Sequence, residues 1–351
     1  MSDEIYLRLR ERLDHTQGPF PETASGVELR ILKKLFTPEE AGLALHLSHL
    51  PEPPSAIAGR AGMDESQAAK ILESMALQGS ILRARGGDKV FYFAIPFIVG
   101  VYEFHLNSLD RELAEMVEEY MPHLRSKWSG NKTKQVRVIP VEASVPARLK
   151  VEPYHKVREL IMSNDKFAVA ECICRKEKGL LGHKCERPHE TCLAIGAGAH
   201  YYIENKIGRE ISREEALKVL KLAEDNALVL SPSNAQKIVN ICCCCSCCCG
   251  VLQSLKAQPK PALEIDSPFQ ARIDKDLCSG CGECMERCQM EAIREGDEYE
   301  VILDRCIGCG LCVPTCPTEA VTLVMKPEQV VPPKHYLDTT ITIMKERGII
   351  K

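Results

Sequence analysis

Nineteen cysteines are the residues of this 351-residue chain whose type and spacing point most directly to chemistry. None precedes Cys172, and they form three groups, within 172–192, 242–249 and 278–316. Thiolates are soft ligands for iron and zinc, and close spacing in a long chain favours metal binding over disulfides. The cysteines therefore predict metal centres rather than a disulfide scaffold.

The last group repeats the spacing C-x2-C-x2-C-x3-C with a constant offset. The two copies are Cys278, Cys281, Cys284 and Cys288, then Cys306, Cys309, Cys312 and Cys316. Glycines between the cysteines let the loop backbone fold close to the thiolates. A zinc ribbon is the alternative, although zinc sites usually use two C-x2-C pairs. Three cysteines in a row at this spacing favour an iron–sulfur cluster in each copy.

With these motifs, residues 271–325 resemble a bacterial two-cluster ferredoxin domain. Cys316-Pro317 matches that pattern, whereas Gln289 stands where the family usually has proline. The resemblance implies two [4Fe–4S] clusters, with the fourth cysteine of each motif binding the other cluster. The implied ligand sets are Cys278, Cys281, Cys284 and Cys316 for one cluster, and Cys306, Cys309, Cys312 and Cys288 for the other.

The earlier cysteines predict further metal binding. Cys172-x-Cys174 is followed by Cys185 and Cys192, and basic residues that favour the thiolate form crowd this segment. Seven more cysteines lie within 242–249, and adjacent side chains diverge, so these seven cannot all bind one cluster. We expect one or two additional iron–sulfur clusters, with zinc or unligated buried thiols as alternatives. The candidate ligands are Cys172, Cys174, Cys185, Cys192, Cys242, Cys244, Cys245, Cys247 and Cys248.

The whole chain also resembles a group of iron–sulfur proteins from anaerobic microbes. The stretches that carry this resemblance are Leu35–Ala41, Glu171–Cys192 and Ile241–Cys249. Cys243 is an extra cysteine relative to that pattern. The resemblance implies cluster binding and redox work, but no particular reaction.

Before the first cysteine, the sequence predicts three helices and a two-stranded hairpin, the element order of a winged helix. Thr37-Pro38-Glu39-Glu40 is a capping box, and Asp64 is placed to cap the third helix. We expect the hairpin to turn at Gly86-Gly87. An acidic amphipathic helix over 109–124 follows, then a strand over 136–141 and helices over 154–164 and 212–227.

Charge divides the chain much as the cysteines do. The net charge is −7 over 1–120, +9 over 121–260 and −6 over 261–351. We predict an α+β multidomain fold with a winged-helix-like domain (1–125), a Cys-rich middle domain (126–256) and a ferredoxin-type domain (257–351). Each half of the 28-residue ferredoxin repeat is expected to be a strand, a cysteine loop, a short helix and a strand.

These features predict an electron-carrying protein or subunit that serves a partner oxidoreductase in an anaerobic cytoplasm. No secretory signal or membrane span is predicted, because the chain has no run of 18 apolar residues. A redox-sensing transcription regulator is one alternative, but its candidate recognition helix (64–81) has a net charge of −2, which disfavours DNA binding. An oxidoreductase with its own substrate at the middle cluster is another.

Overall fold

The N-terminal helices begin where the sequence places their caps. In the computed structural model, the Thr37 side chain accepts the Glu40 N–H and the Glu40 side chain accepts the Thr37 N–H. The Asp64 carboxylate accepts the Gln67 N–H. The elements are α1 (Ser2–Asp14), α2 (Val27–Leu35), α3 (Pro38–Ala44), α4 (Pro54–Ala61), α5 (Glu65–Gln78), β1 (Leu82–Gly86) and β2 (Lys89–Phe93). The predicted order of helices and hairpin is therefore present.

The hairpin turns one residue later than predicted. Gly86 pairs with Lys89, so the turn residues are Gly87 and Asp88. Gly87 has a φ of 61°, which glycine adopts without steric cost. The structure describes residues 2–128, 131–146, 149–296 and 298–350. None of the helices in these ranges is long and apolar enough to cross a bilayer.

A short irregular segment joins the hairpin to the acidic helix. It contains η1 (Phe97–Val101), α6 (Tyr102–Phe104) and η2 (Leu106–Ser108), followed by α7 (Arg111–Trp128). The predicted helix over 109–124 is α7. Val99 has a φ of 56° inside η1, which is unusual for a β-branched residue.

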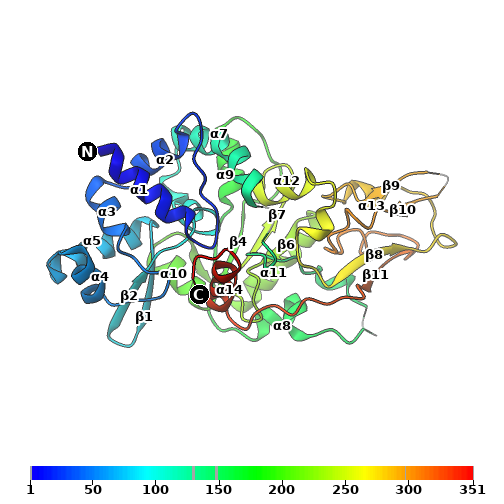
Figure 1. Cartoon of the computed structure of the whole chain (residues 1–351). Coiled ribbons are helices and arrows are strands. Elements are labelled where there is room, and N and C mark those ends of the chain that lie inside the picture. Colours follow the sequence, from blue (N-terminus) through cyan, green and yellow to red (C-terminus); the bar gives the residue numbers. More distant parts are fainter. Residues whose placement is uncertain (1, 129–130, 147–148, 297, 351) are drawn as a thin grey trace.

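A five-stranded antiparallel sheet forms the middle of the molecule, in the order β5-β3-β4-β7-β6 (Figure 1). Its strands are β3 (Phe167–Glu171), β4 (Glu190–Ile195), β5 (Arg209–Ile211), β6 (Val229–Pro232) and β7 (Asn240–Cys244). The helices are α8 (Val157–Met162), α9 (Ile173–Leu180), α10 (Ala197–Glu204), α11 (Arg213–Asp225) and α12 (Gly250–Lys256). The helix predicted over 212–227 is α11, and the one over 154–164 divides into η4 (Pro153–His155) and α8. The predicted strand over 136–141 forms only isolated bridges.

Both faces of this sheet are buried, and side-chain size distinguishes them. On β3, Phe167 and Val169 belong to the core beneath α8 and α11, whereas Ala168 and Ala170 belong to the core shared with α10 and the N-terminal elements. Successive strand residues point to opposite faces, so each position on β3 fixes the face of its neighbours on β4. We call the sheet face beneath α8 and α11 the α11 face, and the opposite face, beneath α10 and the N-terminal elements, the α10 face.

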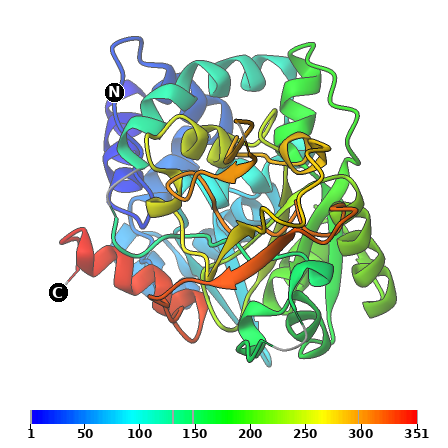
Figure 2. The ribbon, with the colours of Figure 1, turned by 90° about the vertical axis from the view of Figure 1, so that its right-hand side faces the viewer.

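The ferredoxin-like part lies at the opposite end of the molecule from the N-terminal helices (Figures 1 and 2). Its elements are β8 (Phe269–Ile273), α13 (Glu283–Glu286), β9 (Ile293–Arg294), β10 (Glu300–Val301) and β11 (Val321–Met325). β8 pairs with β11, and β9 with β10. The second repeat half contains turns where the first has α13. The closing helix α14 (Tyr336–Glu346) returns to the N-terminal part, where the Gln17 amide donates to the Tyr336 hydroxyl.

The internal repeat is visible in the backbone as well as in the sequence. Residues 28 positions apart share positive φ angles: 71° and 67° at Gly280 and Gly308, and 52° and 55° at Glu291 and Glu319. The two cysteine loops therefore fold in the same way around their thiols.

Candidate metal centres

One ferredoxin quartet surrounds a cavity. Cys288, Cys306, Cys309 and Cys312 line a space of about 390 Å³, and Cys288 comes from the other half of the repeat. The Ala271 N–H donates to Cys306 Sγ at 3.3 Å, and the Ala292 N–H donates to Cys288 Sγ at 3.2 Å. Burial raises the pKa of Cys309 to about 12. Four convergent thiols with N–H donors to sulfur form a donor set that fits an iron–sulfur cluster.

The other ferredoxin quartet lies nearer the surface. Cys281 is exposed, Cys278 and Cys316 are half-buried, and Cys284 is buried. Burial raises the pKa of Cys316, but backbone N–H groups, led by that of Val321, lower it by more. This loop therefore holds a more accessible thiol set than the one around the cavity.

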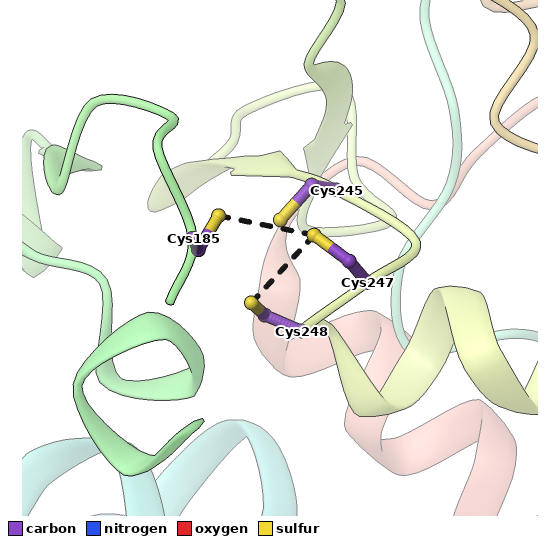
Figure 3. Close-up of side chains that lie close together, drawn as sticks. All are labelled: Cys185, Cys245, Cys247 and Cys248. Carbon is purple, nitrogen blue, oxygen red and sulfur yellow. Dashed lines mark hydrogen bonds between the residues drawn. The ribbon is translucent and has the colours of Figure 1, made fainter. Parts of the chain in front are cut away.

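A third quartet joins two segments of the middle part. The Sγ atoms of Cys185, Cys245, Cys247 and Cys248 all lie within 4.8 Å of one another (Figure 3). Cys185 comes from the loop between α9 and β4, and the other three from the turn between β7 and α12. The Sγ of Cys247 is 3.8 Å from that of Cys185 and 3.7 Å from that of Cys248. Thiolates about 2.3 Å from one tetrahedral ion are separated by about 3.8 Å, so this quartet is already arranged for metal.

Six other thiols border a larger cavity between the sheet and the N-terminal part. This cavity has a volume of about 960 Å³ and is also lined by Val99, Glu103 and Arg125. Cys243 and, from the third quartet, Cys245 and Cys248 also border this cavity. The other six are Cys172, Cys174, Cys192, Cys242, Cys244 and Cys249. We call them the six-thiol group. Cys172, Cys174, Cys185 and Cys192 lie in one segment of the sequence, but the fold divides them. Cys185 joins the third quartet, and the other three join the six-thiol group.

Cys249 is a candidate ligand that the sequence analysis missed. It is the N-cap residue of α12, and its thiol interacts with those of Cys174 and Cys244. The interaction with Cys174 is the main cause that lowers the pKa of Cys249 well below its usual value. The only sequence signal was its place at the end of the cysteine run, which did not distinguish it from its neighbours.

Cys243 lies on the other face of the sheet from its neighbours. Cys192 is paired with Cys242, and also with Ala170, so all three point to the α10 face. Because side chains alternate along β7, Cys243 points to the α11 face, where it is 2% exposed. Burial raises the pKa of its thiol. Cys243 therefore packs its thiol in the core on the α11 face, although the residue also borders the larger cavity.

Arg175 is a buried cation beside these thiols. Its side chain is fully buried, and it donates to the Thr191 hydroxyl at 2.8 Å and to the Cys243 carbonyl at 2.9 Å. No carboxylate forms an ion pair with it among the described residues. Burial lowers the pKa of Arg175, but thiolates, with Cys172 first among them, raise it by more. The negative charge that balances this guanidinium must therefore come from sulfur.

Two carboxylic acids near the larger cavity have raised pKa values. Burial raises the pKa of Glu103 to about 7, although its carboxylate accepts the Gly100 N–H at 2.8 Å. Burial likewise raises the pKa of Glu177 to about 7, and this carboxylate accepts a hydrogen bond from the Tyr102 hydroxyl. These groups can hold protons near neutral pH beside the thiols.

The two arginines of the hairpin are already paired. The Arg83 side chain is 1% exposed and forms ion pairs with Glu73 on α5 and Glu204 on α10. Arg85 contacts the same two acids. The charge that would contact phosphates is therefore engaged within the protein, which further disfavours DNA binding.

Comparison with known proteins identifies one region of the chain. No protein of curated function and no solved structure matches the chain. Residues 271–323 match the family of 4Fe-4S dicluster domains. The chain thus contains a 4Fe–4S dicluster domain, and its other cysteines gather in a separate Cys-rich group.

Proposed function

We propose that this protein transfers single electrons between redox partners, using two [4Fe–4S] clusters in the ferredoxin-type part and at least one further iron–sulfur centre among the middle cysteines. An iron–sulfur cluster supplies a one-electron carrier whose potential depends on burial and on hydrogen bonds to sulfur. The supporting observation is the cavity that Cys288 shares with Cys306, Cys309 and Cys312, because its four thiols come from both repeat halves. The other set is Cys278, Cys281, Cys284 and Cys316.

The two cysteine regions are joined by a direct hydrogen-bonded contact. The Gln289 side-chain oxygen accepts the Ser246 N–H at 2.9 Å and the Ser246 hydroxyl at 3.0 Å. Gln289 follows Cys288, and Ser246 lies between Cys245 and Cys247. This contact holds the ferredoxin cavity beside the third quartet and supports a path for electrons between them.

The partner we expect is an acidic redox protein or an oxidoreductase subunit. The net charge of +9 over residues 121–260 favours encounter with an acidic surface. A reduced partner would donate one electron, and an oxidised partner would accept it. We propose the cytoplasm of an anaerobe as the compartment in which the protein carries electrons.

Cluster analysis of the full chain tests this function. After anaerobic reconstitution, we expect at least about eight iron and eight sulfide per chain, with dithionite-reducible electron paramagnetic resonance (EPR) signals. Cys316→Ala should remove the signal of the cluster bound by Cys278, Cys281 and Cys284, and Cys288→Ala that of the other.

Cys243→Ala is the matched control and should keep every signal, because this thiol lies in the core on the α11 face. Fewer than about four iron atoms in reconstituted wild-type protein would contradict the proposal. If Cys316→Ala instead removed the cluster of Cys306, Cys309 and Cys312, the crossed ligand sets would be wrong.

A further inference from the structure

The six-thiol group belongs to the middle part and lies outside the dicluster match at 271–323. It shares its cavity with Cys245 and Cys248 of the third quartet, but it is not part of that quartet's close grouping of Sγ atoms. We propose that Cys172, Cys174, Cys192, Cys242, Cys244 and Cys249 together bind one polynuclear iron–sulfur cluster that is larger than a single cube.

The six thiols form a continuous row. Cys192 and Cys242 lie directly opposite each other on β4 and β7, and Cys244 follows on the same face of β7. Cys249 at the start of α12 connects that face to Cys174 in the first turn of α9. Neighbouring thiols affect one another's pKa in the order Cys172, Cys174, Cys249, Cys244, Cys242, Cys192. A single cube takes four thiolates, so two members of this row would have no role in it.

The cavity is larger than the one around a ferredoxin quartet in the same chain. The space beside the six thiols, which is partly open to solvent, measures about 960 Å³, compared with about 390 Å³ for the similarly open space beside Cys288, Cys306, Cys309 and Cys312. We assign the smaller space to one cube. The larger space is more than twice that size and is bordered by nine cysteines, compared with four, so it suits a cluster with more metal ions.

Charge and an unpaired polar atom also point to an anionic occupant. Arg175 is fully buried without a carboxylate partner among the described residues, and the thiolates of Cys172, Cys245 and Cys244 are the charges that favour its protonated form. The Ser231 hydroxyl lines the same cavity, is opposite Cys242 on β6, and has no hydrogen-bond partner. A buried hydroxyl without a partner is costly, and a sulfide or thiolate sulfur of a bound cluster would accept its hydrogen bond.

The third quartet is a different kind of site. Its four Sγ atoms lie within 4.8 Å of one another, whereas the six thiols extend in a row along their cavity. The same close grouping occurs nowhere else among the described residues. Thiolates of both sets, Cys172 and Cys244 from the six-thiol group and Cys245 from the third quartet, raise the pKa of Arg175, so one cation can balance charge in both centres.

Iron and sulfide counting on variants of the full chain tests this proposal. We would reconstitute wild type, Cys172→Ala/Cys192→Ala and Cys243→Ala anaerobically with ferrous iron and sulfide. The double variant removes both ends of the row, and Cys243→Ala removes a neighbouring thiol on the opposite face. The double variant should lose more than about four iron per chain, whereas Cys243→Ala should match wild type.

EPR of the ferredoxin clusters reports in each sample that the chain is folded. A loss of about four iron or fewer from a folded double variant would overturn the proposal. The iron content of Cys247→Ala is a second measurement, because this variant keeps all six thiols and removes one thiol of the third quartet. More than about twelve iron in this variant supports the larger cluster, and twelve or fewer contradicts it, even if the double variant does not fold.

This test is separable from that of the proposed function. Loss of the ferredoxin signals in Cys316→Ala and Cys288→Ala concerns residues 271–323 alone. A six-thiol cluster would still appear as iron that is retained in those variants and lost from the double variant.

Discussion

Cys192 and Cys242 face each other as directly paired residues of β4 and β7, on the sheet face that the N-terminal part covers. This pairing brings together two cysteine segments that are far apart in the sequence. Val99, Glu103 and residues of α7 also line the cavity beside these cysteines. The N-terminal part therefore forms part of the wall of a thiol site.

Arg175→Met should destabilise the metal-loaded protein more than the metal-free protein. In the loaded state, the guanidinium balances thiolate charge, and its loss also leaves the Thr191 hydroxyl and the Cys243 carbonyl without their donor. We expect a loss of about 3 kcal/mol. In the metal-free state with protonated thiols, the buried cation has less to balance, so the loss should be smaller. Anaerobic urea denaturation with and without metal measures both values.

Arg175→Lys is the control, because it keeps the charge but cannot reproduce both hydrogen bonds. It should lie between wild type and Arg175→Met when metal is bound. Equal destabilisation by Arg175→Met in the loaded and metal-free states would mean that only the hydrogen bonds matter.

Gly308→Ala and Gly280→Ala should differ, although the two glycines are equivalent in the repeat. A Cβ on Gly308 would overlap the carbonyl oxygen of Phe269, whereas the nearest atom to a Cβ on Gly280 is Tyr299 Cε2 at 3.9 Å. Both have φ near +70°, which costs an alanine about 1 kcal/mol. We expect Gly280→Ala to lose about that much and Gly308→Ala about 3 kcal/mol or more.

Anaerobic thermal denaturation and iron retention measure this difference. Gly308→Ala should also lose iron from the cavity that it lines, while Gly280→Ala keeps its iron. Equal losses in the two variants would show that backbone conformation, and not the contact with Phe269, sets the cost.

Gln289→Leu should loosen the contact between the ferredoxin-type part and the cysteine turn. It removes the acceptor for two Ser246 hydrogen bonds, each worth about 1 kcal/mol. We expect about 2 kcal/mol of destabilisation and faster amide exchange at Ser246, measured by hydrogen–deuterium exchange. Gln289→Glu keeps an acceptor and should protect Ser246. Unchanged exchange in Gln289→Leu would mean that packing alone holds this contact.

His155 should make the protein less stable in acid. Burial is the main cause, and the Arg137 charge a second, that lowers the pKa of His155 to about 4 from 6.5. The unfolded chain therefore binds a proton at higher pH than the folded chain, so this contribution to stability is complete above about pH 6.5 and is lost as the pH falls towards 4. After allowance for solvent screening, the contribution of His155 to the free energy of unfolding is on the order of 2 kcal/mol.

Urea denaturation between pH 7 and 4 measures this dependence in wild type and His155→Gln. The variant should show a shallower fall in unfolding free energy over that range. An identical slope would place the acid sensitivity elsewhere in the chain.

The sequence predicts local features well where neighbours in the chain determine them. Thr37 and Asp64 cap their helices as predicted, because capping depends on residues three positions apart. The hairpin turn is wrong by one residue, because the pairing of Gly86 with Lys89 is set across two strands. The strand predicted over 136–141 forms only isolated bridges, since its partners are scattered: Leu230 lies in β6, and Ser233 and Asp266 lie in loops.

The sequence by itself determined that this is an α+β chain with a 4Fe–4S dicluster domain, because the cysteine spacing within one loop fixes which thiols can converge. Only the tertiary structure decided how the middle cysteines are divided. Cys185 joins Cys245, Cys247 and Cys248, Cys249 joins the six-thiol group, and Cys243 turns to the core. The physical reason is that strand alternation and the pairing of β4 with β7 assign each thiol to a face, and a run of adjacent cysteines carries no record of that pairing.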